Sequence, residues 1–163
     1  MTALPGALLD NNAAHVSNSN QPELPRAPAR KLAVLACMDA RLNVEQVLDL
    51  RLGDAHVIRN AGGIATDDAI RSIVISQHLL GTEEVIVIEH SECGMLTFQD
   101  ADVHRHLVEQ TGVDIDLAFH AFPDLEANLR EQVARIRAHP WIKDVPVRGF
   151  IYDIDTRELR ELR

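Results

Sequence analysis

The sequence has few cysteines, few aromatic residues and fewer basic than acidic residues. Its 163 residues include 2 cysteines, too few for the disulfide framework of a small secreted domain. The 16 Lys and Arg residues stand against 25 Asp and Glu residues, giving a formal charge of −9. A general surface for nucleic acid or anionic membranes is therefore not expected. Aromatic residues make up 4% of the chain, so aliphatic side chains must fill the core.

Long apolar runs are also absent. No stretch approaches the roughly 20 consecutive apolar residues that a membrane-spanning helix needs. The first residues lack the basic and apolar regions of a signal peptide. These absences predict a cytoplasmic protein without a membrane partner, in a reducing compartment that keeps both cysteines as thiols.

The length and the hydrophobic fraction of 46% fit a single globular unit. Residues 1–30 mix a short apolar patch with polar residues and then several prolines. We expect them to form an N-terminal arm with one short helix near residues 8–16. Residues 31–163 are expected to form one α/β domain.

Four segments predict the strands of one sheet, at residues 32–37, 55–58, 85–89 and 147–154, and the first and third of them are apolar runs. Runs that are apolar throughout are typical of strands buried on both faces, and helices between them imply right-handed crossovers and a parallel sheet. Helices are predicted at residues 43–52, 66–80, 101–110 and 123–138. Thr66 is the expected N-cap of the second helix, and Gly53 and Gly81 are expected to end the first and the second.

Both cysteines lie where predicted strands end. Cys37 ends the first run, and His90 and Cys93 follow the third. Because the carboxyl ends of neighbouring parallel strands meet at one edge of the sheet, these three side chains could surround one point. Thiolate sulfur and imidazole nitrogen are zinc ligands, and three protein ligands leave a fourth position open, as in catalytic sites. The alternative is that the cysteines are small buried hydrophobes and His90 an ordinary strand-end histidine.

An acidic and a basic residue follow the first cysteine. Asp39 and Arg41 lie in the predicted strand-to-helix loop, two and four residues past Cys37. The carboxylate could occupy the fourth zinc position or accept a hydrogen bond from a zinc-bound hydroxide. Arg41 would hold Asp39 ionised and turned away from the metal, because a bidentate guanidinium lowers the pKa of a carboxylate. A surface ion pair worth under about 1 kcal/mol is the alternative.

Three separated motifs carry a family resemblance. They are C-x-D-x-R at Cys37, Asp39 and Arg41, R-N-A-G at residues 59–62, and H-x-x-C-G-M at residues 90–95. In this order and spacing they resemble the β-class carbonic anhydrases, in particular the short bacterial members of that class.

The resemblance implies a fold, a reaction and an assembly. It implies an α/β fold whose central parallel sheet has four strands in the order 2-1-3-4, flanked by helices. It implies an N-terminal arm packing on a partner subunit in a homodimer, and it allows a tetramer made of two dimers. The implied reaction is the reversible hydration of carbon dioxide to bicarbonate and a proton by attack of zinc-bound hydroxide.

The resemblance also assigns residues. The family's zinc ligands fall on Cys37, His90 and Cys93, and its catalytic pair falls on Asp39 and Arg41. The implied substrate-binding residues are Asn60, Ala61, Gly62 and Gly94.

Two features depart from the family pattern. Met38 and Ala40 stand where many members have serine, and Gln46 does not align convincingly with the glutamine that helps to hold substrate in plant-type members. Both departures concern substrate binding rather than the metal ligands.

The ligand chemistry predicts a pH dependence. Two thiolates and a neutral imidazole leave the zinc site formally neutral, so its water should be less acidic than in a three-histidine site. Activity should therefore rise toward alkaline pH, and acid should let Asp39 take the place of the water. The candidate proton carriers are His56, His78, His104, His106 and His120.

Two other functions fit the same residues. Hydrolysis of carbonyl sulfide or carbon disulfide needs the same nucleophile and differs in the shape of the pocket. A non-catalytic zinc-binding or redox module, in which Cys37 and Cys93 form a reversible disulfide, leaves Asp39 and Arg41 without a role.

Overall fold

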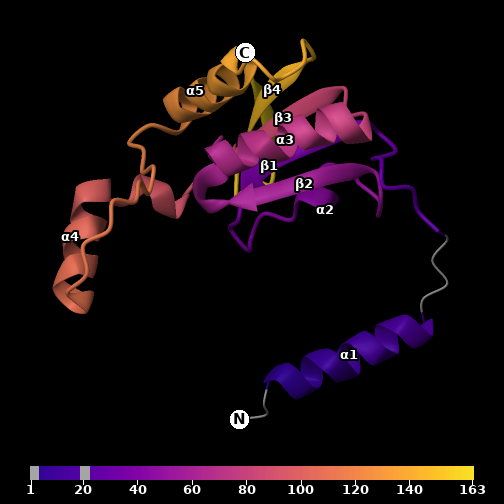
Figure 1. Cartoon of the computed structure of the whole chain (residues 1–163), viewed down its shortest axis with the longest axis horizontal. Coiled ribbons are helices and arrows are strands. Elements are labelled where there is room, and N and C mark those ends of the chain that lie inside the picture. The colour runs from indigo at the N-terminus through magenta and orange to yellow at the C-terminus, as the bar shows by residue number, and fades with distance from the viewer. Residues whose placement is uncertain (1–3, 19–22) are drawn as a thin grey trace.

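The fold is described by a computed structural model, which covers residues 4–18 and 23–163. One five-stranded sheet in the order β2-β1-β3-β4-β5 forms its centre (Figure 1). The strands are β1 (Leu32–Cys37), β2 (Ala55–Asn60), β3 (Glu84–His90), β4 (Val147–Tyr152) and β5 (Leu159–Leu162).

The first four strands are parallel, which confirms the predicted order 2-1-3-4. Strand β5, which pairs antiparallel with β4, was not predicted from the sequence. It also ended β2 too early, because Arg59 and Asn60 still pair with the last two residues of β1.

The described residues also form five α-helices. They are α1 (Leu4–Asn18), α2 (Val44–Val47), α3 (Asp67–Leu80), α4 (Asp100–Thr111) and α5 (Leu125–Ala138), with short 3₁₀ turns η1 (Ala61–Gly63) and η2 (Gly94–Leu96). The predicted ends of α3 are confirmed: the Thr66 hydroxyl accepts a hydrogen bond from the Ala69 amide, and Gly81 adopts the left-handed conformation with φ 78°.

The helix predicted at residues 43–52 is wrong in extent, because α2 makes little more than one turn. Asp49 adopts a left-handed conformation with φ 47°, and the Leu50 amide donates back to the Glu45 carbonyl at 2.8 Å. This reversal ends the helix well before Gly53, although the apolar spacing beyond it still fits a helix.

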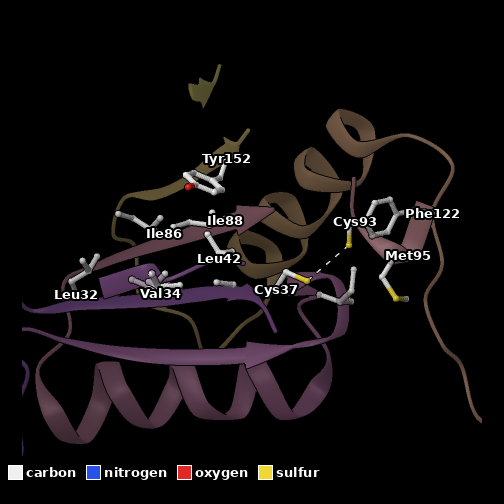
Figure 2. Packing of buried hydrophobic residues seen from close by; sticks show 13 residues of the cluster. Leu32, Val34, Cys37, Leu42, Ile86, Ile88, Cys93, Met95, Phe122 and Tyr152 are labelled. Atoms are coloured by element: carbon white, nitrogen blue, oxygen red, sulfur yellow. Dashed lines mark hydrogen bonds between the residues drawn. The ribbon is translucent and has the colours of Figure 1, made fainter. Parts of the chain in front are cut away.

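The two faces of the sheet are covered differently. Helices α3 and α5 pack on one face, where Ile73 and Leu129 join buried residues of β1, β3 and β4. The other face carries a second apolar cluster, in which Val34 and Ile88 pack with Leu42 from the loop before α2. In Figure 2 the Cys37 and Cys93 sulfur atoms face each other within this second cluster, with Met95 and Phe122 beyond them, so the two proposed sulfur ligands belong to the core.

Two helices make little contact with the core. Helix α1 stands apart from the sheet in Figure 1, and its described side chains, from Gly6 to Ser17, are exposed. Helix α4 has no buried residue. Within the two described ranges, no helix combines the length and the apolar character needed to cross a membrane.

Close packing of α5 on the sheet gives a stability prediction at Gly149. A Cβ atom added there would lie 3.0 Å from Leu129 Cγ and 3.1 Å from Val133 Cγ2. We expect Gly149→Ala to lower the free energy of unfolding by about 1–3 kcal/mol, the usual cost of overpacking. Urea unfolding measures this free energy. Gly112→Ala is unsuitable as a control, because Gly112 has φ 70° and an alanine there would be strained. Gly6→Ala, with nothing near the added atom, is the control; equal stability of Gly149→Ala and the unmodified chain would contradict the packing argument.

Candidate metal centre

The ends of β1 and β3 bring three potential metal ligands together. The ligand atoms of Cys37, His90 and Cys93 all lie within 4.8 Å of one another, and the two Sγ atoms are 3.9 Å apart. The three residues are 4%, 0% and 3% exposed. Neighbouring parallel strands thus deliver Cys37 and His90 to one edge, and the turn after β3 brings the Cys93 sulfur back toward that of Cys37 (Figure 2).

The donor atoms fit a zinc ion. The Nδ1–H of His90 donates to the Ser91 carbonyl at 2.7 Å, so the lone pair remains on Nε2. That Nε2 atom is buried and has no hydrogen-bond partner among the described residues. A buried nitrogen without a partner beside two thiols is expected of a metal ligand and is costly otherwise.

The electrostatics of the group also favour a cation. A hydrogen bond from Cys93 lowers the pKa of Cys37, while the same interaction raises the pKa of Cys93. Burial alone would lower the pKa of His90, yet the neighbouring Cys37 sulfur and the Ser91 carbonyl raise it. Negative charge shared by the two neighbouring sulfur atoms would attract a cation to this point.

Asp39 and Arg41 form a tight pair next to the ligands. Arg41 Nε donates to Asp39 Oδ1 at 3.0 Å and Nη2 donates to Oδ2 at 2.8 Å, and the Arg41 amide donates to Oδ1 at 2.8 Å. These contacts hold the pKa of Asp39 far below its usual range. Asp39 Oδ2 lies 3.7 Å from His90 Nε2, so the carboxylate faces the ligand group.

Two residues that hold this pair, Glu92 and Arg59, were not predicted from the sequence. Glu92 accepts a hydrogen bond from Arg41 Nη1 at 3.2 Å, and its carbonyl accepts one from Nη2 at 3.2 Å. Arg59 donates to the Cys37 carbonyl at 3.0 and 2.7 Å and to the Asp39 carbonyl at 2.7 Å. Arg59 belongs to the R-N-A-G motif at residues 59–62, but the motif does not indicate which backbone groups its side chain contacts.

The predicted substrate-binding residues lie in two turns at the same edge. Ala61 and Gly62 are in η1, directly after β2, and Gly94 opens η2 after Cys93. Asn60 uses its side chain within its own turn: Nδ2 donates to the Ile64 carbonyl at 2.7 Å and Oδ1 accepts from the Ile64 amide at 2.8 Å. Its side chain therefore shapes the turn.

A cavity of about 710 Å³ lies on the Arg41 side of the pair and is lined by Arg41, Gln46 and Tyr152, among others. Gln46, which showed no convincing alignment with the substrate-holding glutamine of plant-type members, therefore lines the same cavity as Arg41. The candidate proton carriers make their described contacts away from this cavity. His56 is hydrogen-bonded to Ser76 at 2.7 Å. The others lie on α3, on α4 or in the segment after α4, and they are His78, His104, His106 and His120.

Comparisons with known proteins show the family to which this chain belongs. The family model described as carbonic anhydrase matches residues 32–159. The β-carbonic anhydrase 1 of Mycobacterium tuberculosis is 44% identical, over 94% of this chain and 94% of that protein. The crystal structure of a carbonic anhydrase from Streptococcus mutans superposes with a TM-score of 0.93 at 41% identity, covering 100% of this chain and 99% of the other. A carbon disulfide hydrolase of an Acidianus species is 38% identical, over 81% of this chain and 77% of that protein. A family match across most of the chain and relatives of this similarity make this chain a member of the β-carbonic anhydrase family.

Proposed function

We propose that the chain catalyses the reversible hydration of carbon dioxide to bicarbonate and a proton, with one zinc ion per chain. The observation that carries this proposal is the convergence of three ligand atoms within 4.8 Å, next to a carboxylate held by an arginine. Membership of the β-carbonic anhydrase family supports it.

Cys37, His90 and Cys93 would hold the metal through two sulfur atoms and one imidazole nitrogen. When bound, zinc would supply a Lewis acid that acidifies water, more weakly with two thiolate ligands than with three neutral imidazoles. His90 is already in the required tautomer, because its Nδ1–H is committed to the Ser91 carbonyl.

Asp39 and Arg41 would act as the catalytic pair. Asp39 stays ionised across the physiological range, because Arg41 lowers its pKa, and its Oδ2 can accept a hydrogen bond from the attacking oxygen. That hydrogen bond would turn a lone pair of the attacking oxygen toward the carbon of the substrate. Arg41 fixes the carboxylate through two parallel hydrogen bonds, and Glu92 fixes Arg41 in turn.

Substrate would lie between the turns that follow β2 and Cys93. Ala61, Gly62 and Gly94 would line it with small side chains and backbone, which suits a linear molecule of three atoms. Asn60 would contribute by holding the turn through Ile64. A residue larger than glycine at position 62 is unfavourable, since φ is 81° and a Cβ would lie 3.1 Å from Met95 Cγ.

Stopped-flow measurement of carbon dioxide hydration across pH, on samples of known zinc content, tests the proposal. We expect about one zinc per chain and a rate that climbs above neutral pH. One zinc per chain without hydration at any pH would refute the reaction and retain the metal site. A rate that is flat from mildly acidic to strongly alkaline pH would contradict the argument from ligand charge.

A second candidate function is the hydrolysis of carbonyl sulfide or carbon disulfide. It is favoured by the similarity to the carbon disulfide hydrolase from Acidianus, which covers most of this chain. Both substrates are linear like carbon dioxide but larger. Measuring hydrogen sulfide release from each, beside bicarbonate formation on the same sample, separates the two functions.

The N-terminal arm, residues 1–30, would pack on a partner subunit in a homodimer, while residues 31–163 would form the catalytic domain. Support comes from α1, where Leu8, Leu9 and Val16 are 61%, 71% and 65% exposed. Apolar side chains at this exposure on a helix apart from the sheet are suited to burial by a second chain. A tetramer would then be a pair of such dimers. A reducing compartment such as the cytoplasm would keep the two ligand cysteines as thiols.

Charged residues on α1 should break this dimer. We expect the double substitution Leu8→Asp and Leu9→Asp to raise the dimer dissociation constant by at least about 100-fold, because burying each leucine contributes roughly 1.5–3 kcal/mol. Light scattering during size-exclusion chromatography measures the mass. The double substitution Asn11→Asp and Asn12→Asp adds the same charge at polar positions and serves as control. If both variants have the mass of the unmodified chain, α1 is not the dimer contact.

A further inference from the structure

A chain of buried polar side chains that the proposed reaction does not use runs beneath the metal centre. Glu89, Asn128 and Gln132 are 1%, 8% and 5% exposed. Asn128 Nδ2 donates to Glu89 Oε1 at 2.7 Å, and Gln132 Nε2 donates to Asn128 Oδ1 at 3.0 Å. Gln132 Oε1 accepts from the Ala65 amide at 2.9 Å. Three hydrogen bonds thus connect the end of β3, by way of α5, to the segment after β2.

This chain is an expensive way to fill the core. Glu89 Oε2 is buried without a hydrogen-bond partner among the residues described, and apolar side chains of similar size would avoid that cost. Asn128 and Gln132 lie one turn apart on α5, on the side where Leu129 and Ile136 are fully buried. Two amides on the buried side of a helix suggest a function other than packing.

The end of the chain holds the turn that lies against Cys37. Gly63 has φ 70°, and a Cβ atom there would lie 3.1 Å from the Cys37 nitrogen and 3.1 Å from the Ile88 carbonyl oxygen. The turn is therefore wedged between β1 and β3. The Asn60 side chain closes it at Ile64, and Gln132 holds it at the next residue, Ala65.

The same turn reaches the sulfur of a proposed metal ligand. Gly63 packs against the Cys37 backbone, and the backbone N–H of its neighbour Gly62 makes a hydrogen bond to the Cys37 side chain that helps to lower the pKa of this thiol. An N–H group directed at a thiolate withdraws charge from the sulfur, and such contacts around metal ligands alter the metal's affinity and acidity.

We propose that Asn128 and Gln132 are positioning residues that hold the Gly62–Gly63 turn against Cys37 and so set how strongly this sulfur donates charge to the metal. The proposal deepens the proposed function and rests on its zinc site. It assigns α5, which supplies none of the proposed ligands, a role in tuning the metal centre.

Losing the Gln132 anchor should loosen the turn and weaken the hydrogen bond to Cys37. The sulfur would then donate more charge, and the midpoint of the hydration rate against pH should move upward by roughly half a pH unit, the effect of part of one hydrogen bond. Zinc affinity should fall by about 10- to 100-fold, as for other residues that orient metal ligands. The value of kcat at a fixed pH near neutrality should change more than KM.

The experiment compares three variants. Gln132→Met removes both hydrogen bonds at similar length, and Gln132→Glu keeps an oxygen that accepts from the Ala65 amide. Glu131→Gln, at an exposed position of the same helix, is the matched control. For each we would measure the thiolate-to-cobalt absorption band of the cobalt-substituted protein, zinc affinity by chelator competition, kcat and KM across pH, and urea unfolding.

We expect Gln132→Met to shift the cobalt band, weaken zinc binding and move the pH midpoint upward. Gln132→Glu should restore most of each value. Glu131→Gln should give the values of the unmodified chain. If Gln132→Met lowers stability and leaves the band, the affinity and the midpoint unchanged, Gln132 only supports the fold and the proposal is wrong. If Gln132→Met fails to fold, Asn128→Ser is measured instead. This variant interrupts the hydrogen-bonded chain at its middle residue and should give a smaller shift of the same sign. If Asn128→Ser gives no shift, the proposal is wrong.

Failure of the proposed function is recognised separately. An unmodified chain that binds zinc and cobalt but hydrates no carbon dioxide refutes the reaction, while the cobalt band and the zinc affinity still test the role of Gln132. An unmodified chain that binds neither metal refutes both proposals.

Discussion

Replacing Asp39 by Asn should lower kcat/KM for carbon dioxide hydration by about 10²- to 10⁴-fold, the usual contribution of a positioned acid–base group. The variant keeps the size of the side chain but removes the charge that Arg41 holds in place at 2.8 and 3.0 Å. The amide group would also present a donor where an acceptor is needed. Zinc content should stay at one per chain, because Asp39 is not one of the three proposed ligands.

The control for this prediction is Asp68→Asn. Asp68 also pairs with an arginine, Arg71, at 2.7 Å, but lies exposed on α3, and we expect its hydration rate to stay within experimental error. Stopped-flow hydration and metal analysis on the same samples give both quantities. A rate for Asp39→Asn within about threefold of the unmodified chain would show that the carboxylate has no part in the reaction.

The other large effect is expected for His90→Ala, which should abolish measurable hydration and weaken zinc binding by more than the roughly 100-fold seen for residues that only orient ligands. His90 is fully buried, and its Nε2 has no hydrogen-bond partner among the described residues. Thermal unfolding provides a second readout, because a ligand present at 1,000 times its dissociation constant stabilises the folded state by about 4 kcal/mol. Added zinc should raise the Tm of the unmodified chain and leave that of His90→Ala unchanged.

His78→Ala is the matched control, since His78 is an exposed histidine whose Nε2 contacts the Trp141 carbonyl at 2.8 Å. It should bind zinc normally. Cys93→Ala should repeat the loss seen for His90→Ala, so the conclusion does not depend on one variant. Full zinc binding by both ligand variants would mean that the metal lies elsewhere.

The parallel part of the fold could be predicted from sequence because its two central strands, β1 and β3, carry uninterrupted apolar runs. In β1 all six residues are buried, and such a run has few alternatives. β5 was missed because its sequence, Leu-Arg-Glu-Leu, is short and half charged. It is recognised as a strand only once the chain turns back at residues 153–158 and pairs with β4. Helix α2 was predicted too long because the spacing of apolar residues does not reveal that a single residue, Asp49, adopts the left-handed conformation.

In the candidate metal centre, too, some residues could be predicted from the sequence pattern and others depend on contacts in three dimensions. Its three ligands were predicted to meet because carboxyl ends of neighbouring parallel strands share an edge, and the structure brings these side chains together. Arg59, Glu92 and Gln132 could not be found in this way. Their contacts depend on which backbone groups lie opposite them in three dimensions, and a motif records residue types but not these neighbours.

The two sulfur atoms 3.9 Å apart have a practical consequence for work with the purified protein. The chain has 2 cysteines, and both belong to this one buried group, so a reagent that reacts with thiols reports on a single place in the molecule. Colour released by such a reagent should be small while the metal is held and should rise to two equivalents per chain as a chelator removes it. An inexpensive titration in a plate reader can therefore follow occupancy of the centre through purification and storage.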